Sequence, residues 1–281
     1  VFLEKKWFTT AYKNKEFSLN INEDNTCTIN LKNIPCQMII MEEFKITFNE
    51  LIKKELELVN TPEFYVLGDS KIELNFYRWK QKIVTMKLCD KLKAWTFQIV
   101  CALEIGYRNY KFVHNDLHVD NVMMQPTTDK YIYYSYASID IKVPTYGYIV
   151  KIIDFGRATY SYKSREFISE VFDPSNEAGN TYIWIEDKKR KKIDTNPSFD
   201  LARFSCSLFE ELEKDNKVLD PRGSIVTLMR SWTFDDLGSD MTELKGYDLY
   251  IEISHNLHRA DPKDQIFRNC FKDFFFYRLT L

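Results

Sequence analysis

The sequence predicts an α+β fold with a β-rich amino-terminal part and a mainly helical remainder. Short runs of β-branched and aromatic residues, separated by polar turns, occupy residues 14–44. Longer segments with apolar residues at helical spacing follow, the strongest over residues 88–110. A few short β-rich runs lie between the helices and border two polar motifs. These three observations favour strands and helices that are largely segregated along the chain.

The composition is that of a globular protein. The chain has 281 residues, enough for one large domain or two lobes around a substantial apolar core. Its net charge of -2 gives no bulk attraction to nucleic acid or to an anionic membrane. No apolar run approaches the ~18 residues of a membrane span. We therefore expect no nucleic-acid partner and no membrane partner.

The cysteines and the first residue bear on where the protein is found. Six cysteines show no C-x-x-C spacing, and no secretory signal is present. Reduced, buried thiols of an intracellular protein are the favoured interpretation. Because the chain begins with Val rather than Met, we interpret it as a processed or truncated product.

Two short strands are predicted near the amino terminus. Residues 17–21 and 26–31 are rich in β-forming residues, and the polar segment 22–25 predicts the turn between them. The apolar run 36–41 predicts a buried strand that leads into a connector.

Two helices should follow. Thr47 and Glu50 form a capping box, which predicts that a helix starts there. Residues 88–110 carry one apolar stripe and should form the strongest helix. The polar-aromatic residues 60–87 show no clear period and receive no assignment.

Further strands are predicted in the middle of the chain. Residues 122–124, 131–143 and 148–153 are each expected to form one. The stretch 157–195 lacks a regular period, and its basic run, residues 186–192, is interpreted as a solvated loop.

The last part of the chain is expected to be helical. Residues 196–198 read Asn-Pro-Ser, which predicts a helix start, and apolar residues at helical spacing continue over 199–212. Residues 224–281 should also be helical, with breaks near Gly238 and Gly246.

Two motifs carry the chemistry. Residues 114–121 read H-x-D-L-x-x-x-N, and residues 153–156 end in D-F-G. Phosphoryl transfer from a metal nucleotide needs a carboxylate to receive a hydroxyl proton, and oxygen ligands for magnesium. Asp116 is the candidate proton acceptor, and Asn121 and Asp154 are the candidate magnesium ligands.

Three neighbouring residues are expected to support this site. His114 would anchor the loop by packing and hydrogen bonding, Phe155 would pack under the site, and Gly156 would let the backbone turn away. Each motif alone is weak, because a D-F-G can end any strand. Their conjunction is specific: a long helix, H-x-D-L-x-x-x-N, strands, D-F-G, and then an Asp at a helix start.

With this order of motifs, residues 36–212 resemble the eukaryotic-type protein kinase superfamily. The resemblance implies a protein-kinase-like bilobal fold, with a partial small lobe over residues 1–43 and a mainly helical large lobe over 44–281. It implies that the buried Asp200 braces the catalytic loop from a later helix. ATP and Mg²⁺ are the implied cofactors. The implied nucleotide contacts, at the hinge between the lobes, are Met41 as gatekeeper, Glu42, Glu43 and Phe44.

Two positions of the first motif depart from the common kinase pattern. His118 stands where most protein kinases place a Lys against the transferring phosphate, and haspin-like and many small-molecule kinases have His there. The resemblance thus gives His118 a catalytic place. Asn115 replaces the usual Arg that pairs with a phosphate on the activation segment. We therefore expect activity that does not depend on phosphorylation.

The small lobe departs further. No glycine precedes Gly68, so the usual Gly-rich loop is absent, and no strand Lys followed by a helix precedes the hinge. We expect that the chain begins partway through the small lobe, or that the protein is a pseudokinase.

Within the superfamily, the sequences H-N-D-L-H, D-F-G-R-A and N-P-S-F-D-L are most similar to the divergent serine/threonine kinases of giant (nucleocytoplasmic large) DNA viruses. This similarity implies an ATP-dependent protein serine/threonine kinase. Its partners would be a nucleotide and a protein substrate, and its location the host cytoplasm or the virion.

Two alternatives stay open. A small-molecule phosphotransferase of the aminoglycoside or choline kinase type is favoured by His118 and by the Asn-Pro-Ser-Phe-Asp-Leu-Ala segment. A non-catalytic pseudokinase scaffold is favoured by the missing Gly-rich loop and Lys. The long path from Asp154 to Asp200 favours a protein kinase over the first alternative. The second is opposed by the intact Asp116, Asn121 and Asp154.

Overall fold

The computed structural model describes residues 17–21, 27–31, 43–60, 71–176, 178–182, 184–187 and 190–276. The chain divides into two compact units, Val1–Glu43 and Phe44–Leu281, which are described separately. Strands and helices are both present, and the sheets are small and antiparallel, which confirms the predicted α+β class. The division into a small and a large lobe stays a prediction.

The first unit contains one described hairpin. Strand β1 (Phe17–Ile21) pairs antiparallel with β2 (Cys27–Leu31), with Phe17 opposite Leu31. The two predicted strands are thus confirmed to within one residue. The turn and the strand expected over 36–41 lie outside the described residues.

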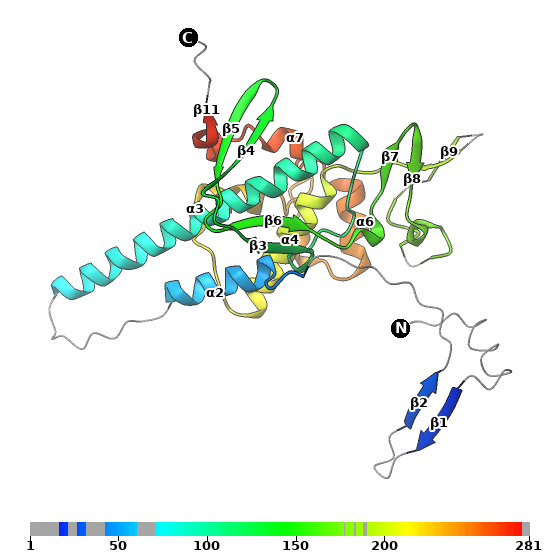
Figure 1. The fold of residues 1–281 in the computed structure, drawn as a ribbon, viewed down its shortest axis with the longest axis horizontal. Helices are drawn as coiled ribbons and strands as arrows, with labels where there is room; N and C mark the ends of the chain where they lie inside the picture. Colours follow the sequence, from blue (N-terminus) through cyan, green and yellow to red (C-terminus); the bar gives the residue numbers. More distant parts are fainter. Residues whose placement is uncertain are drawn as a thin grey trace. The chain divides into compact units, whose positions relative to one another are not determined.

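Two helices begin the second unit (Figure 1). Helix α2 (Phe48–Asn60) starts at the predicted capping box: the Glu50 amide donates to Thr47 Oγ1 at 3.1 Å, and the Thr47 amide to Glu50 Oε2 at 3.0 Å. Helix α3 runs from Lys71 to Tyr110, so it begins well before the predicted residue 88. Residues 71–105 contain neither Gly nor Pro, so no helix breaker interrupts them. The helix therefore extends through residues 71–87, where the apolar stripe is absent.

The core of the second unit forms where α3 meets the later helices. Trp95 and Ile99 of α3 are fully buried, as is Phe204 of α4 (Phe199–Lys214). The indole Nε1 of Trp95 donates to the Thr145 carbonyl at 2.8 Å, which ties α3 to the chain before β6. The elements α5 (Ser224–Ser231), α6 (Tyr247–Asn256) and α7 (Pro262–Gln265) complete the helical part.

Two small sheets lie against α3. Strand β3 (Val122–Pro126) pairs with β6 (Tyr148–Ile152), and in Figure 1 this pair lies between α3 and α2. The other sheet has the order β11 (Phe275–Phe276), β5 (Ile139–Pro144), β4 (Tyr131–Tyr136).

One predicted strand is a hairpin. The stretch 131–143, expected as a single strand, turns at Ala137 and Ser138, which have φ values of 50° and 64°. Turns of this kind usually carry Gly or Asn, so their sequence signal is absent here.

The segment after β6 is built of short elements. A 3-10 turn, η2 (Phe155–Arg157), leads to the hairpin of β7 (Tyr160–Tyr162) and β8 (Arg165–Phe167), and then to η3 (Glu170–Phe172). Strands β9 (Trp184–Asp187) and β10 (Arg190–Ile193) then pair with each other. Residues 186–187 and 190–192 of the basic run thus lie in paired strands, so the interpretation of these residues as a loop is wrong.

The predicted breaks in the carboxyl-terminal part are present. Gly238 (φ 96°) precedes the 3-10 turn η4 (Met241–Glu243), and Gly246 (φ 59°) precedes α6. Another 3-10 turn, η5 (Asn269–Phe274), follows α7. Among the described helices, none has both the length and the apolarity needed to cross a membrane.

Candidate active site

The first motif lies in the loop over residues 111–121, which we call the H-x-D loop. It joins the end of α3 to β3 and ends in the 3-10 turn η1 (Val119–Asn121). The buried carboxylate of Asp200, in the first turn of α4, holds the start of this loop. Its two oxygens accept the amides of His114 at 2.8 Å and Asn115 at 2.9 Å. Burial raises the pKa of Asp200, while these two amide donors oppose the rise.

His114 links the two motifs. Its ring is fully buried, and Nε2 lies 2.8 Å from the Ile153 carbonyl, while Nδ1 accepts the Asp116 amide at 3.3 Å. Because a carbonyl can only accept, Nε2 carries the ring proton. The Phe155 ring contacts the His114 ring edge-on at 5.6 Å and remains 57% exposed. His114 therefore joins the H-x-D loop to the residue immediately before Asp154.

Asn121 and Asp154 are brought together by the β3–β6 pairing. Val122 lies opposite Ile152, and the Ile153 amide donates to the Asn121 carbonyl at 3.0 Å. The Asn121 side-chain nitrogen donates to the Asp116 carbonyl at 3.0 Å, and its side-chain oxygen has no hydrogen-bond partner among the described residues. All three candidate residues thus lie at one end of this strand pair.

Asp154 adopts a left-handed backbone conformation, with φ 64°. Its side chain accepts the Gly156 amide at 3.3 Å, and the residue is exposed. A non-glycine residue in this conformation is uncommon and often marks a functional position.

The donor set fits a hard cation that shares its shell with phosphate. Within the described ranges, no three His, Cys, Asp or Glu side chains gather closely enough to hold a metal ion by themselves. Asn121 and Asp154 offer oxygen atoms, and Mg²⁺ is usually held by one or two such protein ligands plus substrate phosphates and water. These residues therefore fit the magnesium of a bound nucleotide.

The Asp116 carboxylate lies between two side chains that the sequence did not single out. The Tyr250 hydroxyl of α6 is 2.5 Å from its Oδ1, and Arg157 Nε is 3.7 Å from its Oδ2. Arg157 follows the D-F-G directly, but nothing in the local sequence links α6 to Asp116. Only tertiary packing brings Tyr250 to this place.

His118 lines a pocket of about 400 Å³ next to Asp116. Arg203 and Tyr250 form part of the same wall. Burial is the main cause of the lowered pKa of His118. The Asp116 carboxylate raises this pKa, and the Arg203 guanidinium lowers it. At neutral pH the ring is therefore uncharged.

Asn115 makes structural contacts that no local sequence pattern indicates. Its side-chain nitrogen donates to the Arg157 carbonyl at 3.0 Å, and its oxygen accepts the Tyr182 hydroxyl at 2.6 Å. Its φ of 63° is one that Asn tolerates better than most residues. The Asn115 side chain thus ties the H-x-D loop directly to the segment after Asp154.

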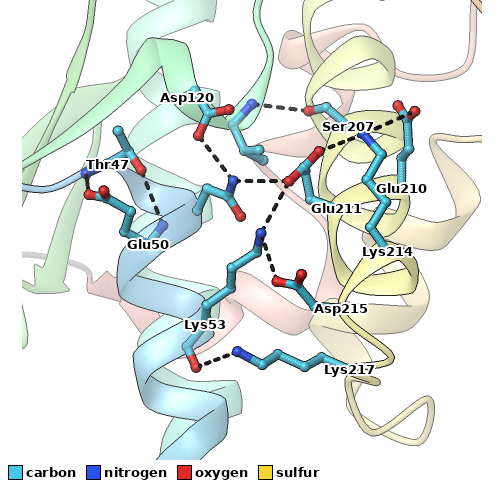
Figure 2. Close-up of polar contacts among 12 residues, drawn as sticks. Thr47, Glu50, Lys53, Asp120, Ser207, Glu210, Glu211, Lys214, Asp215 and Lys217 are labelled. Carbon is cyan, nitrogen blue, oxygen red and sulfur yellow. Dashed lines mark hydrogen bonds and ion pairs between the residues drawn. The ribbon is translucent and has the colours of Figure 1, made fainter.

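The end of the H-x-D loop is held from α2 and α4 (Figure 2). Asn49 Nδ2 donates to Asp120 Oδ1 at 3.0 Å, and the Lys53 ammonium lies 3.1 Å from Glu211 Oε2 and 2.8 Å from Asp215 Oδ2. The Lys214 hydrogen bond, followed by that of Lys53, lowers the pKa of Glu211 to about 2. Polar contacts thus connect both helices to the loop.

The expected nucleotide contacts cannot be placed as a group. Met41 and Glu42 lie outside the described residues. Glu43 is exposed and Phe44 half-buried, and they belong to different units. Their contact with adenine stays a prediction.

Comparison with known proteins relates the chain loosely to serine/threonine kinases. No family model matches it. It is 30% identical over 104 residues to a probable serine/threonine-protein kinase of Dictyostelium discoideum, covering 35% of this chain and 8% of that protein. It is 36% identical over 58 residues to a serine/threonine-protein kinase haspin homolog of Drosophila melanogaster, covering 21% and 10%.

A viral protein is also similar. An uncharacterized protein of invertebrate iridescent virus 6 is 31% identical over 113 residues, covering 38% of this chain and 18% of that protein. All three matches span less than a fifth of the relative's own length. They support a kinase-like relationship and no finer assignment.

Proposed function

We propose that this protein transfers the γ-phosphoryl group of Mg-ATP to a serine or threonine hydroxyl of a protein substrate. The observation that carries the proposal is that Asp116, Asn121 and Asp154 come together at one end of the β3–β6 pair. A proton acceptor and two oxygen ligands are what phosphoryl transfer asks of a protein. The partial similarity to serine/threonine kinases supports the same proposal.

Each residue has a role that follows from its chemistry. Asp116 accepts the proton of the attacking hydroxyl, and its backbone is fixed by the hydrogen bond from Asn121. Asn121 and Asp154 present oxygen atoms to magnesium, which neutralises phosphate charge when it is bound. His114 keeps the H-x-D loop in register with Asp154 through the Ile153 carbonyl. The loop is thus built mainly for positioning, which suits a reaction with a reactive donor.

A protein acceptor is favoured over a small molecule by the segment between Asp154 and Asp200. This segment contains the β7–β8 and β9–β10 hairpins, more chain than a direct connection between the two residues needs. In its length this segment is like the activation segment of a protein kinase. His118 is the feature that fits the small-molecule alternative, so the test includes small acceptors.

The test is transfer of labelled phosphate by the full chain. We expect γ-labelled ATP with Mg²⁺ to label serine or threonine in a generic basic or acidic protein, and not choline or an aminoglycoside. Asp116→Ala should lower turnover by about two to four orders of magnitude while nucleotide binding is retained. Asp154→Ala should abolish magnesium-dependent nucleotide binding.

Three outcomes would contradict the proposal. An unchanged rate in Asp116→Ala would remove the proton acceptor from its role. Labelling of choline or an aminoglycoside instead of protein would favour the small-molecule phosphotransferase. Nucleotide binding without transfer to any acceptor would favour the pseudokinase scaffold.

A further inference from the structure

The side chain of Tyr250 reaches the candidate proton acceptor from far along the chain. It projects from α6, and its hydroxyl is 2.5 Å from Asp116 Oδ1. The Tyr250 ring packs against Phe199, the first residue of α4, at a centroid distance of 5.7 Å. Asp200 is the next residue of α4 after Phe199, and it binds the start of the H-x-D loop. The first turn of α4 therefore positions both the Tyr250 side chain and the loop.

The direction of the hydrogen bond between Tyr250 and Asp116 is fixed by a third residue. Arg203 Nε donates to the Tyr250 hydroxyl oxygen at 3.1 Å. A guanidinium can only donate, so this contact uses the oxygen of the phenol as acceptor and leaves its single proton for Asp116. Burial raises the pKa of Tyr250, which keeps that proton in place at neutral pH.

The two oxygens of Asp116 are in different situations. Oδ1 receives the short hydrogen bond from Tyr250, whereas Oδ2 forms an ion pair with Arg157 Nε at 3.7 Å, which is longer than a hydrogen bond. The Arg157 guanidinium also lies over the Tyr250 ring, 5.4 Å from its centroid. Oδ1 is thus hydrogen-bonded to Tyr250, and Oδ2 can still accept a hydroxyl proton.

We propose that Tyr250 is a positioning residue, which holds Asp116 by Oδ1 so that Oδ2 is presented to the acceptor hydroxyl. This inference rests on the proposed function. Without the phenol, the carboxylate can rotate about its side-chain bonds, and fewer encounters have the productive geometry. A misplacement of this kind costs up to about 100-fold in rate. Nucleotide binding does not depend on this orientation.

The test compares two tyrosines that each donate to a carboxylate. Tyr250→Phe removes the bond to Asp116, and Tyr136→Phe removes the bond from Tyr136 to Glu104 Oε1, which is 2.7 Å long and lies outside the H-x-D loop. We expect Tyr250→Phe to lower kcat about 10- to 100-fold with KM for ATP changed by less than about two-fold. Tyr136→Phe should leave both constants unchanged. Melting temperatures and nucleotide affinity show that each variant is folded.

A double variant separates positioning from a general structural effect. In an Asp116→Asn background, Tyr250→Phe should cause no further loss of residual transfer, because no carboxylate is left to position. An equal loss in both backgrounds, or a kcat like that of the wild type in Tyr250→Phe, would overturn the role of Tyr250. If the wild type transfers no phosphate, the proposed function fails first and this role fails with it. If the wild type is active, the result bears on Tyr250 alone.

Discussion

The two ends of the H-x-D loop are held by different kinds of contact. At its start, the buried carboxylate of Asp200 accepts two backbone amides. At its end, Asp120 is bound by Asn49, whose helix is tied to α4 by the Lys53 and Glu211 ion pair. The Lys53 and Glu211 side chains are 22% and 26% exposed. A buried donor that loses its acceptor cannot form a hydrogen bond with water instead, whereas a partly exposed charge can. The contacts at the start of the loop should therefore contribute far more to the free energy of unfolding than those at its end.

The largest effect is expected for Asp200→Ala. Removing the carboxylate leaves the amides of His114 and Asn115 buried without a partner, which should lower the free energy of unfolding by about 3 kcal/mol. Chemical denaturation followed by circular dichroism measures this change. Asp248→Ala is the matched control, because Asp248 lies in the first turn of α6 but is exposed. Its cost should stay below about 1 kcal/mol, and equal costs would contradict the comparison.

Asn115→Ala should have the next largest effect. The variant loses the contacts to Arg157 and Tyr182 and keeps a left-handed backbone that Ala tolerates less well. We expect a loss of about 2 kcal/mol in the free energy of unfolding. Asn216→Ala is its control, because Asn216 has a similar φ of 51° but is exposed. If the two variants lose the same amount, backbone strain alone explains the effect and the buried contacts add nothing.

The start of the loop also shows what the sequence could predict. His114, Asp116 and Asp200 were singled out from the order of the motifs along the chain. Asp200 binds the start of the loop, and His114 contacts the Ile153 carbonyl, whereas the role of Asp116 stays a prediction. The capping box at Thr47 was equally local and is present. Tyr250 and Asn49 were missed because their contacts join residues 134 and 71 positions apart, and no local pattern reports such a contact.

The missed elements have local causes of another kind. Helix α3 continues over residues 71–87 on helix propensity, without the apolar stripe on which the prediction relied. The hairpin at Ala137 and Ser138 turns without the residues that normally mark such a turn. The β9–β10 hairpin carries charges that were interpreted as a solvated loop. In each case the local sequence signal on which the prediction relied was absent although the element formed.

A smaller effect is expected at the end of the loop. Lys53→Met removes the ion pairs with Glu211 and Asp215, and we expect a loss of at most about 1 kcal/mol in the free energy of unfolding. The loss should shrink further in 1 M NaCl, because salt screens partly exposed charges. Lys54→Met, at the adjacent and exposed position of α2, controls for the change in composition. A salt-independent loss above that of Asp200→Ala would reverse the comparison.

The smallest and most specific effect concerns pH. Lys214 and Lys53 lower the pKa of Glu211 from 4.5 to about 2, so its carboxylate stabilises the folded state above pH 4.5 and loses this contribution as the pH falls towards 2. Burial raises the pKa of Asp200 above 3.8, so that group has the opposite slope: its ionised form costs stability as the pH rises through that range.

Comparing wild type with Glu211→Gln isolates the first contribution. Their difference in unfolding free energy should be at most about 1 kcal/mol at pH 6 and should approach zero near pH 2. A difference that grows as the pH falls would show that Glu211 is not held by the two lysines. A difference that shrinks as expected means that acid weakens the contacts at the end of the H-x-D loop. The contact of Asp200 with the start of the loop persists, because a carboxyl group does not need a charge to accept an amide.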